Sequence, residues 1–328
     1  MLSRVANSIY WMSRYLERAE NIARFIDVNL NLTLDMSAKF GEQWAPLVNT
    51  TGDLEQFSKR YRVPTRENVL HFLTFDRENP NSILSCVRHA RENARSVREI
   101  ISSEMWEQAN RFYLLVKDAS KNKSVVGNPT EFYSSVKLAS HLFDGITDAT
   151  MSHGEAWHFL QVGELLERAD KTSRILDVKY YILLPNAQAV GTAIDNIQWA
   201  ALLKSASALE MYRKHSKQID PFKVADFLIL NRDFPRSILS CLERAALSLH
   251  AITGSSLDAF SNKAEQGLGR LLGDLNYTQI DEIIHGGLHE FLDGLQNRLN
   301  WIDDAIFETY FTLRPLIGSN SHLTNHEQ

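Results

Sequence analysis

Residues 17–28 read ERAENIARFIDV and residues 167–178 read ERADKTSRILDV, so the chain contains nearly the same charged segment twice, 150 positions apart. Six of the twelve positions are identical, and Glu20 against Asp170 keeps its charge. A duplicated helix ordinarily keeps its apolar face, on which packing depends, while its charges change. Because the charges are kept here, these residues are the first candidates for function.

A second repeated segment indicates that the whole chain is duplicated. RENPNSILSCVRHA (77–90) matches RDFPRSILSCLERA (232–245) at eight of fourteen positions, with an offset of 155. We therefore predict an all-α fold, a duplicated multi-helix bundle of two copies of ~150 residues around a pseudo-two-fold axis. The expected divisions are a first helical repeat over 1–150, a second over 151–317 and a polar tail over 318–328, the two repeats forming one unit. Cys86 and Cys241 occupy equivalent places and are expected to be buried apolar residues.

The apolar pattern predicts helices along nearly the whole chain. From Leu2 to Leu30, apolar residues recur at alternating spacings of three and four, and only a helix places such positions on one face. Pro and Gly mark breaks, the clearest of them at 184–191. Further helices are predicted at 65–75, 82–102, 103–118, 130–151, 155–182, 196–215, 222–231, 236–253, 256–274, 278–285 and 288–315.

The composition excludes several classes of protein. The 328 residues carry a net charge of −5 and a pI of about 6.1, which does not predict a nucleic-acid surface, since such surfaces concentrate Lys and Arg. Two cysteines do not make a disulfide framework. No run of 18 uncharged apolar residues predicts a membrane span. The expectation is a soluble cytoplasmic protein that binds neither nucleic acid nor membrane.

The charged positions form a stripe beside the apolar face in each copy of the repeated helix, so they are expected to be partly buried. One interpretation is structural: a buried ion network that sets the register of two long helices. The other is an acidic groove between the repeats for an amine, a basic peptide or a metal ion. The stripe residues, with three supporting arginines, are Glu17, Glu20, Arg24, Asp27, Glu167, Asp170, Arg174, Asp177, Arg14, Arg18 and Arg168.

The sequence contains little that resembles a known motif for a metal site, a phosphate site or a catalytic nucleophile. Two Glu-x-x-His spacings, at 155–158 and 282–285, match part of a carboxylate-bridged dimetal motif, but they lie at non-equivalent places in the repeat. The chain contains no GxGxxG, GxxxxGK[ST], GxSxG, CxxC or HExxH. We therefore predict no metal and no cofactor, and no recognisable catalytic residue.

The segments MLSRVANSIYWMSRYLERAENIARFIDV, WHFLQVGELLERADKTSRILDV and YYILLP resemble the bacterial alpha-E domain family, a helical domain of unknown function, over essentially the whole chain. The family's glutamate pattern falls on Glu17, Glu20, Glu167 and Asp170, whereas the pattern implies Arg where this chain has Glu164. The resemblance implies partnership with ATP-grasp amide ligases, encoded beside or fused to such domains, often with transglutaminase-like proteins.

Two functions from different classes follow from this resemblance. The first is a non-catalytic scaffold or accessory subunit of an ATP-grasp amide ligase that makes a peptide or peptide-like product. The alternative is an enzyme of the same pathway, in which a Glu/Asp pair among the stripe residues acts as general acid and base. That alternative requires one of these carboxyls to have a raised pKa. In a third interpretation the stripes are purely structural.

Overall fold

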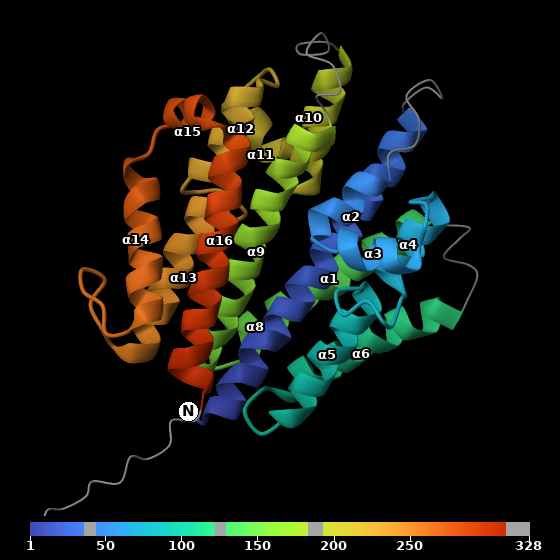
Figure 1. Cartoon of the computed structure of the whole chain (residues 1–328). Coiled ribbons are helices and arrows are strands. Elements are labelled where there is room, and N and C mark those ends of the chain that lie inside the picture. The colour runs from blue at the N-terminus through green and yellow to red at the C-terminus, as the bar shows by residue number, and fades with distance from the viewer. Residues whose placement is uncertain (36–43, 122–128, 183–192, 313–328) are drawn as a thin grey trace, which may run out of the picture.

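The computed structural model describes residues 1–35, 44–121, 129–182 and 193–312, and every segment of regular structure within these ranges is helical (Figure 1). This confirms the predicted all-α class. The first half of the chain contains α1 Ser3–Asp35, α2 Ala45–Thr51, α3 Leu54–Arg60, α4 Arg66–Thr74, α5 Ile83–Ser96, α6 Ser103–Lys121 and α8 Pro129–Thr150. The second half contains α9 Glu155–Ile182, α10 Ala193–Ser205, α11 Leu209–His215, α12 Pro221–Leu230, α13 Ile238–Thr253, α14 Lys263–Tyr277, α15 Ile280–Gly286, α16 Leu288–Ile306 and the π-helical turn η3 Phe307–Phe311.

Helix α1 is buried on more than one side. The predicted heptad stripe is buried from Val5 to Leu30, and only Leu2 at its start is exposed. Tyr10 and Ile22, which lie off this stripe, are also buried. Each fully buried Leu or Ile side chain stabilises the fold by roughly 1.5–3 kcal/mol. A helix covered in this way can only occupy the centre of the bundle.

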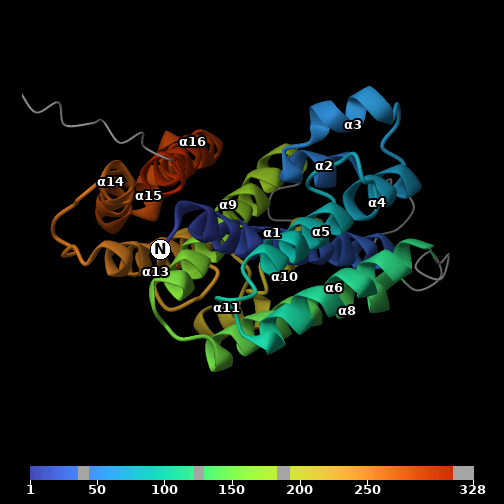
Figure 2. The same cartoon turned by 90° about the horizontal axis from the view of Figure 1, so that it is seen from below.

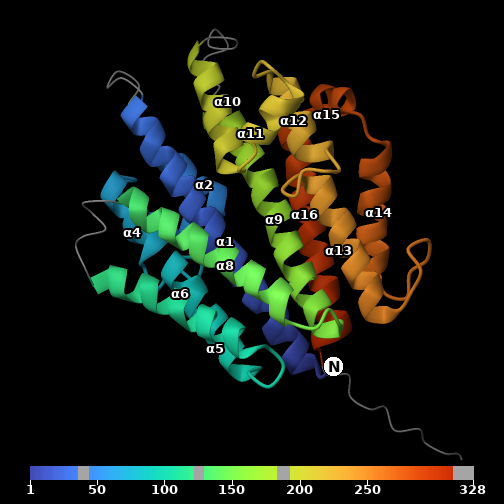
Figure 3. The same ribbon diagram turned by 180° about the vertical axis from the view of Figure 1, so that it is seen from behind.

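The two longest helices, α1 and α9, pack against each other, and the others flank this pair. Helix α1 also packs on α5 and α8, while α9 packs on α13 and α16. Figure 2 shows α14 and α16 on one side of the central pair and α5 and α6 on the other. Figure 3 shows α8 lying along α1 and α13 along α9. Charges on the facing sides of α1 and α9 are therefore enclosed.

The second repeated segment begins a helix in the same way in each half. The hydroxyl of Ser82 accepts from Ser85 N at 3.2 Å, and that of Ser237 accepts from Ser240 N at 3.2 Å, as N-cap residues do. Cys86 and Cys241 follow in the first turn, are free and are buried, as predicted. Burial raises the pKa of each thiol to about 12, so neither is a thiolate near neutral pH.

Four predicted helices have different bounds. The one expected at 288–315 ends as an α-helix at Ile306 and is followed by the π-helical turn η3, which ends at Phe311. Helix 82–102 ends at Ser96, where buried Val97 begins a turn toward α6. Helix 196–215 is divided at Ser207, whose φ of 53° is left-handed and ends α10. Helix 256–274 begins at Lys263, because the side chain of Asn262 caps it. The predicted break at 184–191 and the polar tail 318–328 lie outside the described residues.

None of the helices in the described ranges has both the length and the apolar character that a membrane span requires.

Candidate functional site

The two repeated Glu–Arg dipeptides bind each other across the contact between α1 and α9. Arg168 donates through Nε and Nη2 to the two carboxylate oxygens of Glu17, at 3.0 and 2.8 Å. In return, Arg18 donates through Nε and Nη2 to Glu167, at 2.7 and 2.9 Å. Each pair is bidentate, the strongest geometry between a guanidinium and a carboxylate. Each helix thus provides one anion and one cation to the other.

A close approach of the two helices places these dipeptides opposite each other. A Cβ atom on Gly163 would lie 2.5 Å from both Ser13 Oγ and Tyr10 O, so only glycine allows α9 to come this near α1. Glu17 and Glu167 follow Ser13 and Gly163 by four residues, and a spacing of four keeps them on the same helix faces. The helices are still close together at the next turn, where the guanidinium groups reach across.

Around Glu17, two arginines and an amide satisfy the carboxylate. Besides Arg168, Arg236 donates through Nη1 at 3.0 Å, and Asn21 donates through Nδ2 at 2.8 Å. Arg236 comes from the turn before α13 and also donates to Glu20 at 3.1 Å. Burial alone raises the pKa of Glu17, but Arg168 and Arg236 outweigh it and lower the pKa to about 2. We call this group, with its neighbours Arg24, Asp144 and Glu164, the Glu17 centre.

The outer members of the Glu17 centre are less evenly paired. Arg24 forms an ion pair with Glu20, and burial together with Arg236 lowers the pKa of Arg24 to about 9. Glu164 forms an ion pair with Arg168. Asp144 of α8 lies near this pair, and burial, followed by the charge of Glu164, raises its pKa well above the ordinary value. The Glu17 centre therefore contains four carboxyl groups, Glu17, Glu20, Asp144 and Glu164, and three arginines.

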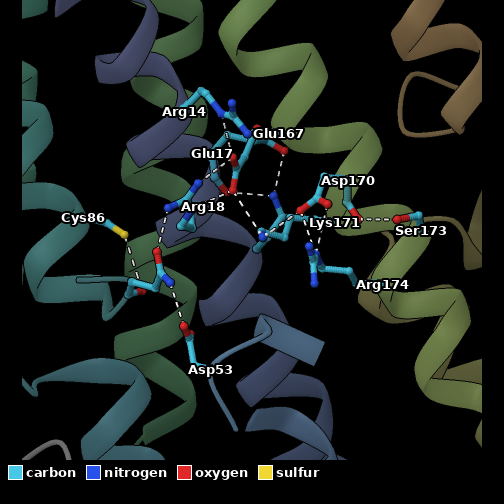
Figure 4. Close-up of polar contacts among 12 residues, drawn as sticks. Arg14, Glu17, Arg18, Asp53, Cys86, Glu167, Asp170, Lys171, Ser173 and Arg174 are labelled. Carbon is cyan, nitrogen blue, oxygen red and sulfur yellow. Dashed lines mark hydrogen bonds and ion pairs between the residues drawn. The ribbon is translucent and has the colours of Figure 1, made fainter. Parts of the chain in front are cut away.

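Glu167 is surrounded by three cations, whereas Glu17 is bound by two arginines and an amide (Figure 4). In addition to Arg18, Arg14 donates through Nε at 2.9 Å, and Lys171 Nζ lies 3.4 Å from Oε1. Burial raises the pKa of Glu167, but Arg18 and Lys171 outweigh it and hold the pKa well below its usual range. Glu167 is completely buried. We call this group, with Asp170, Arg174 and Asp303, the Glu167 centre.

Asp170 and Asp303 complete the Glu167 centre. Arg174 donates through Nε to both oxygens of Asp170, at 3.0 and 2.9 Å, and Lys171 donates to the same carboxylate at 3.0 Å. Burial raises the pKa of Asp170, but Lys171 and Arg174 lower it to about 2. Asp303 of α16 forms an ion pair with Arg14 at 2.5 Å. Four basic residues thus face three acidic ones.

A cavity of about 170 Å³ opens beside the Glu167 centre, between α1, α9, α16 and the end of α2. Its charged lining consists of one carboxylate, Asp170, and four cations, Arg14, Arg18, Lys171 and Arg174. The acidic groove expected from the stripes is therefore not what these residues form. The reason is that Glu167 is buried and is not part of the lining, so the cations that bind it expose their other sides.

Six of the predicted stripe residues belong to the two centres, and two lie apart from them. Asp27 pairs with Lys137 Nζ of α8 at 2.7 Å, and Asp177 with His289 Nδ1 of α16 at 2.6 Å. All three supporting arginines, Arg14, Arg18 and Arg168, are in the network. Sequence reasoning missed Arg236 and Lys171, although both lie within or beside the repeated segments, at positions where the copies differ.

The two Glu-x-x-His spacings do not meet in the fold. Glu155 pairs with the chain's terminal amine at 2.9 Å, and His285 Nδ1 lies 2.7 Å from the backbone oxygen of Asp281. Within the described ranges, no group of three or more His, Cys, Asp or Glu side chains is arranged to hold a metal ion.

Comparison with known proteins identifies one family. A family profile described as "a predicted alpha-helical domain with a conserved ER motif", named Alpha-E, matches residues 1–311. The chain contains three Glu–Arg dipeptides, Glu17–Arg18, Glu167–Arg168 and Glu243–Arg244, and the first two lie in the repeated charged segments of α1 and α9. In this structure the side chains of those two dipeptides bind each other.

Similar curated proteins come from mycobacteria. Uncharacterised proteins of Mycobacterium bovis and of two strains of Mycobacterium tuberculosis are each 22% identical over 341 aligned positions, which cover 96% of this chain. The alignment covers 38% of each relative, so the chain spans about two fifths of the length of the curated relatives it matches. No solved structure matches the chain.

Proposed function

This chain belongs to the Alpha-E family, and we propose that it is a helical accessory protein that works with an ATP-grasp amide ligase on a peptide or peptide-like product. The length of the relatives supports this proposal, because in them a matching region is joined to a larger polypeptide. An accessory unit could act beside a catalytic unit either as a separate chain or as part of a longer polypeptide. Since ATP-grasp ligases consume ATP, we propose a cytoplasmic location for both partners.

The observation that carries the accessory role is the internal pairing of the central carboxylates. Glu17 and Glu167 are buried and bound by guanidinium groups from the opposite helix, so neither faces a substrate. The pKa values of Glu17, Glu167 and Asp170 are lowered, whereas a general acid needs a raised one. This direction weighs against the enzyme alternative built on these residues and favours a rigid scaffold.

We also propose that the two halves are duplicated copies around a pseudo-two-fold axis near the contact of Ser13 with Gly163. The order of helices supports this, since α1, α5, α6 and α8 have counterparts in α9, α13, α14 and α16 with the same neighbours. The reciprocal Glu–Arg pairs are the arrangement that such an axis would produce. If so, the accessory unit presents two related faces to a partner.

Reconstitution with the ATP-grasp ligase encoded in the same genome tests the accessory role. The full chain and the ligase are purified separately, and complex formation is measured by size-exclusion chromatography with light scattering. ATP hydrolysis and amide formation are then followed for each protein and for the mixture. We expect a complex, a change in amide formation in the mixture and no turnover by the helical protein alone. A transglutaminase-like protein from the same genome is tested for binding in the same way.

A catalytically inactive ligase variant is the matched control, because it should still bind while amide formation stops. Turnover by the helical protein alone would favour the enzyme alternative, for which Asp144, with its raised pKa, is a better general acid than the stripe carboxyls. Absence of both a complex and turnover would favour the purely structural interpretation of the charge stripes.

A further inference from the structure

We infer that the cavity beside Glu167 is a binding site for a single oxyanion, either a carboxylate on a short carbon stem or a phosphate group. This site goes beyond the proposed partnership with a ligase, because it belongs to the isolated chain. Its ligand is also opposite in charge to the one expected from the stripes, which was an amine, a basic peptide or a metal ion.

The charge of the lining is the first argument. Among the lining residues, four cations face one carboxylate, Asp170. The balancing anions Glu167 and Asp303 are not part of the lining. Even when they are counted, the four basic residues exceed the three acidic ones. An anion entering the cavity would complete the neutralisation of charges that are partly withdrawn from water, which is where such an interaction is strongest.

Arg174 supplies donors that are free to bind. Its Nε is held by both oxygens of Asp170, which fixes the plane of the guanidinium. Its two terminal nitrogens have no hydrogen-bond or ion-pair partner within the described residues, and 22% of the side chain is exposed. The planar fork of an arginine matches a carboxylate or phosphate through two parallel hydrogen bonds. The group is therefore oriented for an oxyanion before one arrives.

The end of α2 lies directly over this guanidinium. Gly52 has a φ of +79°, and a Cβ built there would lie 3.2 Å from Nη1 of Arg174. Thr51 contributes to the lining beside it. Helix α2 comes from the first half of the chain and Arg174 from the second, so both halves are needed to build the site.

The size and the remaining walls limit what can enter. Drug-sized ligands occupy pockets of about 300–1,000 Å³, and the cavity here is about 170 Å³. It accommodates one anionic group and a few attached atoms. Ile22, Leu166 and Leu299 line the apolar side of the cavity, which suits a short carbon stem. Asn300 of α16 is exposed and also belongs to the lining, which places it where the cavity meets solvent.

Thermal unfolding of the full chain at constant ionic strength tests this inference. The probes are butyrate, inorganic phosphate and butylamine, each titrated against sodium chloride. A ligand that binds only the folded state raises the unfolding midpoint in a saturable way. We expect saturable stabilisation by butyrate or by phosphate and none by butylamine. Stabilisation by butyrate alone identifies an organic carboxylate as the ligand, and stabilisation by phosphate alone identifies a phosphate.

Four variants assign the effect to the cavity. Asn300→Glu places a carboxylate at the entrance, and Arg174→Gln removes the free fork; each should weaken binding about tenfold or more, because charge-assisted hydrogen bonds are lost. Asn297→Glu adds the same charge elsewhere on α16, and Arg24→Gln changes the equivalent arginine of α1; both should retain affinity within about twofold.

Asn300 is exposed, so its variant should fold even if Arg174→Gln does not. Preference for butylamine, the absence of saturation with both anions, or full anion binding by the Asn300→Glu variant would overturn the inference.

Discussion

The Glu17 and Glu167 centres lie at matching positions of two helices with similar sequences, yet they neutralise their central carboxylates differently. Arg236, from a turn, and Asn21, from the helix, bind Glu17. At Glu167 the cation comes from the helix, as Lys171, and the turn provides Asn81, which accepts from Arg18 at 2.7 Å. The additional cation therefore comes from the turn at the Glu17 centre and from the helix at the Glu167 centre, while the Glu–Arg pair is present at both.

A third difference between the two centres concerns their balance of acidic and basic groups. Arg14, in the first copy, adds a cation to the Glu167 centre, whereas Glu164, at the equivalent position of the second copy, adds a carboxylate to the Glu17 centre. The centre with excess cations borders the described cavity, and the one with excess carboxyls contains Asp144, whose pKa is raised. Two networks built on the same bidentate Glu–Arg pairs can therefore differ in the charged groups around those pairs.

The largest difference should appear when each central carboxylate is made neutral. Glu167→Gln leaves Arg18 without a carboxylate partner within the described residues, although Arg14 keeps Asp303 and Lys171 keeps Asp170, and breaking a buried ion pair in this way costs about 3–5 kcal/mol. Glu17→Gln should cost about half as much, because Arg168 still has Glu164 and Arg236 still has Glu20. Urea unfolding at pH 7 measures both free energies.

Lys59→Gln is a control for the loss of an ion pair, since its partner Glu55 and Lys59 itself are both exposed and such pairs contribute little. If Glu17→Gln proved as destabilising as Glu167→Gln, the surrounding cations would not be what distinguishes the two centres.

Helix positions and buried faces could be predicted because they depend on local patterns. The apolar spacing from Val5 to Leu30 requires a helix. The serines before Ile83 and Ile238 mark the starts of two other helices, α5 and α13. The charged residues that share one helix face could also be predicted, since a helix places Glu17, Glu20 and Arg24 on one side.

The partners of those charges could not be predicted from the stripe alone. Arg236 is more than 200 positions from Glu17 in the chain, so only the folded topology brings them within 3.0 Å. The net charge of the cavity lining depends on which side of each guanidinium Glu167 covers, and the composition of the chain does not determine that side. Comparison of the repeats could have identified Arg236 and Lys171, because each stands where the other copy has an asparagine.

Moving the extra cation from the turn to the helix would test the exchange between the centres. Arg236→Asn reproduces Asn81 and removes two ion pairs, those with Glu17 and Glu20, so it should cost about 2–3 kcal/mol. Adding Asn21→Lys reproduces Lys171 and should restore at least half of the lost free energy of unfolding. The Asn21→Lys single variant completes the double-mutant cycle. A double variant less stable than Arg236→Asn would show that the two arrangements are not interchangeable.

The helix contact on which both centres depend can be widened by one carbon atom. Gly163→Ala places a Cβ 2.5 Å from Ser13 Oγ and Tyr10 O, so α9 must move away from α1. Overpacking costs about 1–3 kcal/mol, offset by up to about 1 kcal/mol from the better helix propensity of alanine. Thermal unfolding should show a net loss of about 1–2 kcal/mol. Gly145→Ala in α8, where no atom lies within 4 Å of the new Cβ, should be neutral or stabilising.

The smallest expected effect concerns pH. The pKa of Asp144 is raised above its unfolded value, so its contribution is intact below the unfolded value of 3.8 and is lost as the pH rises toward the folded pKa. Glu17 and Asp170 act in the opposite direction, since stability from their lowered pKa values is lost as the pH falls toward about 2. Glu17 and Asp170 are present in both the parent chain and the Asp144→Asn variant, so their contributions to the pH dependence cancel when the two proteins are compared.

Asparagine has the shape of the protonated acid at every pH, so the Asp144→Asn variant should become more stable than the parent as the pH rises. The gap in the free energy of unfolding between the variant and the parent should widen as the pH rises above the unfolded value of 3.8, because the pKa of Asp144 is raised in the folded protein. Asp148→Asn, four residues along α8 and exposed, should show no such widening. If Asp144→Asn instead lost stability at pH 6, Asp144 would be ionised in the native protein, and the Glu17 centre would carry a net negative charge opposite to that of the Glu167 centre.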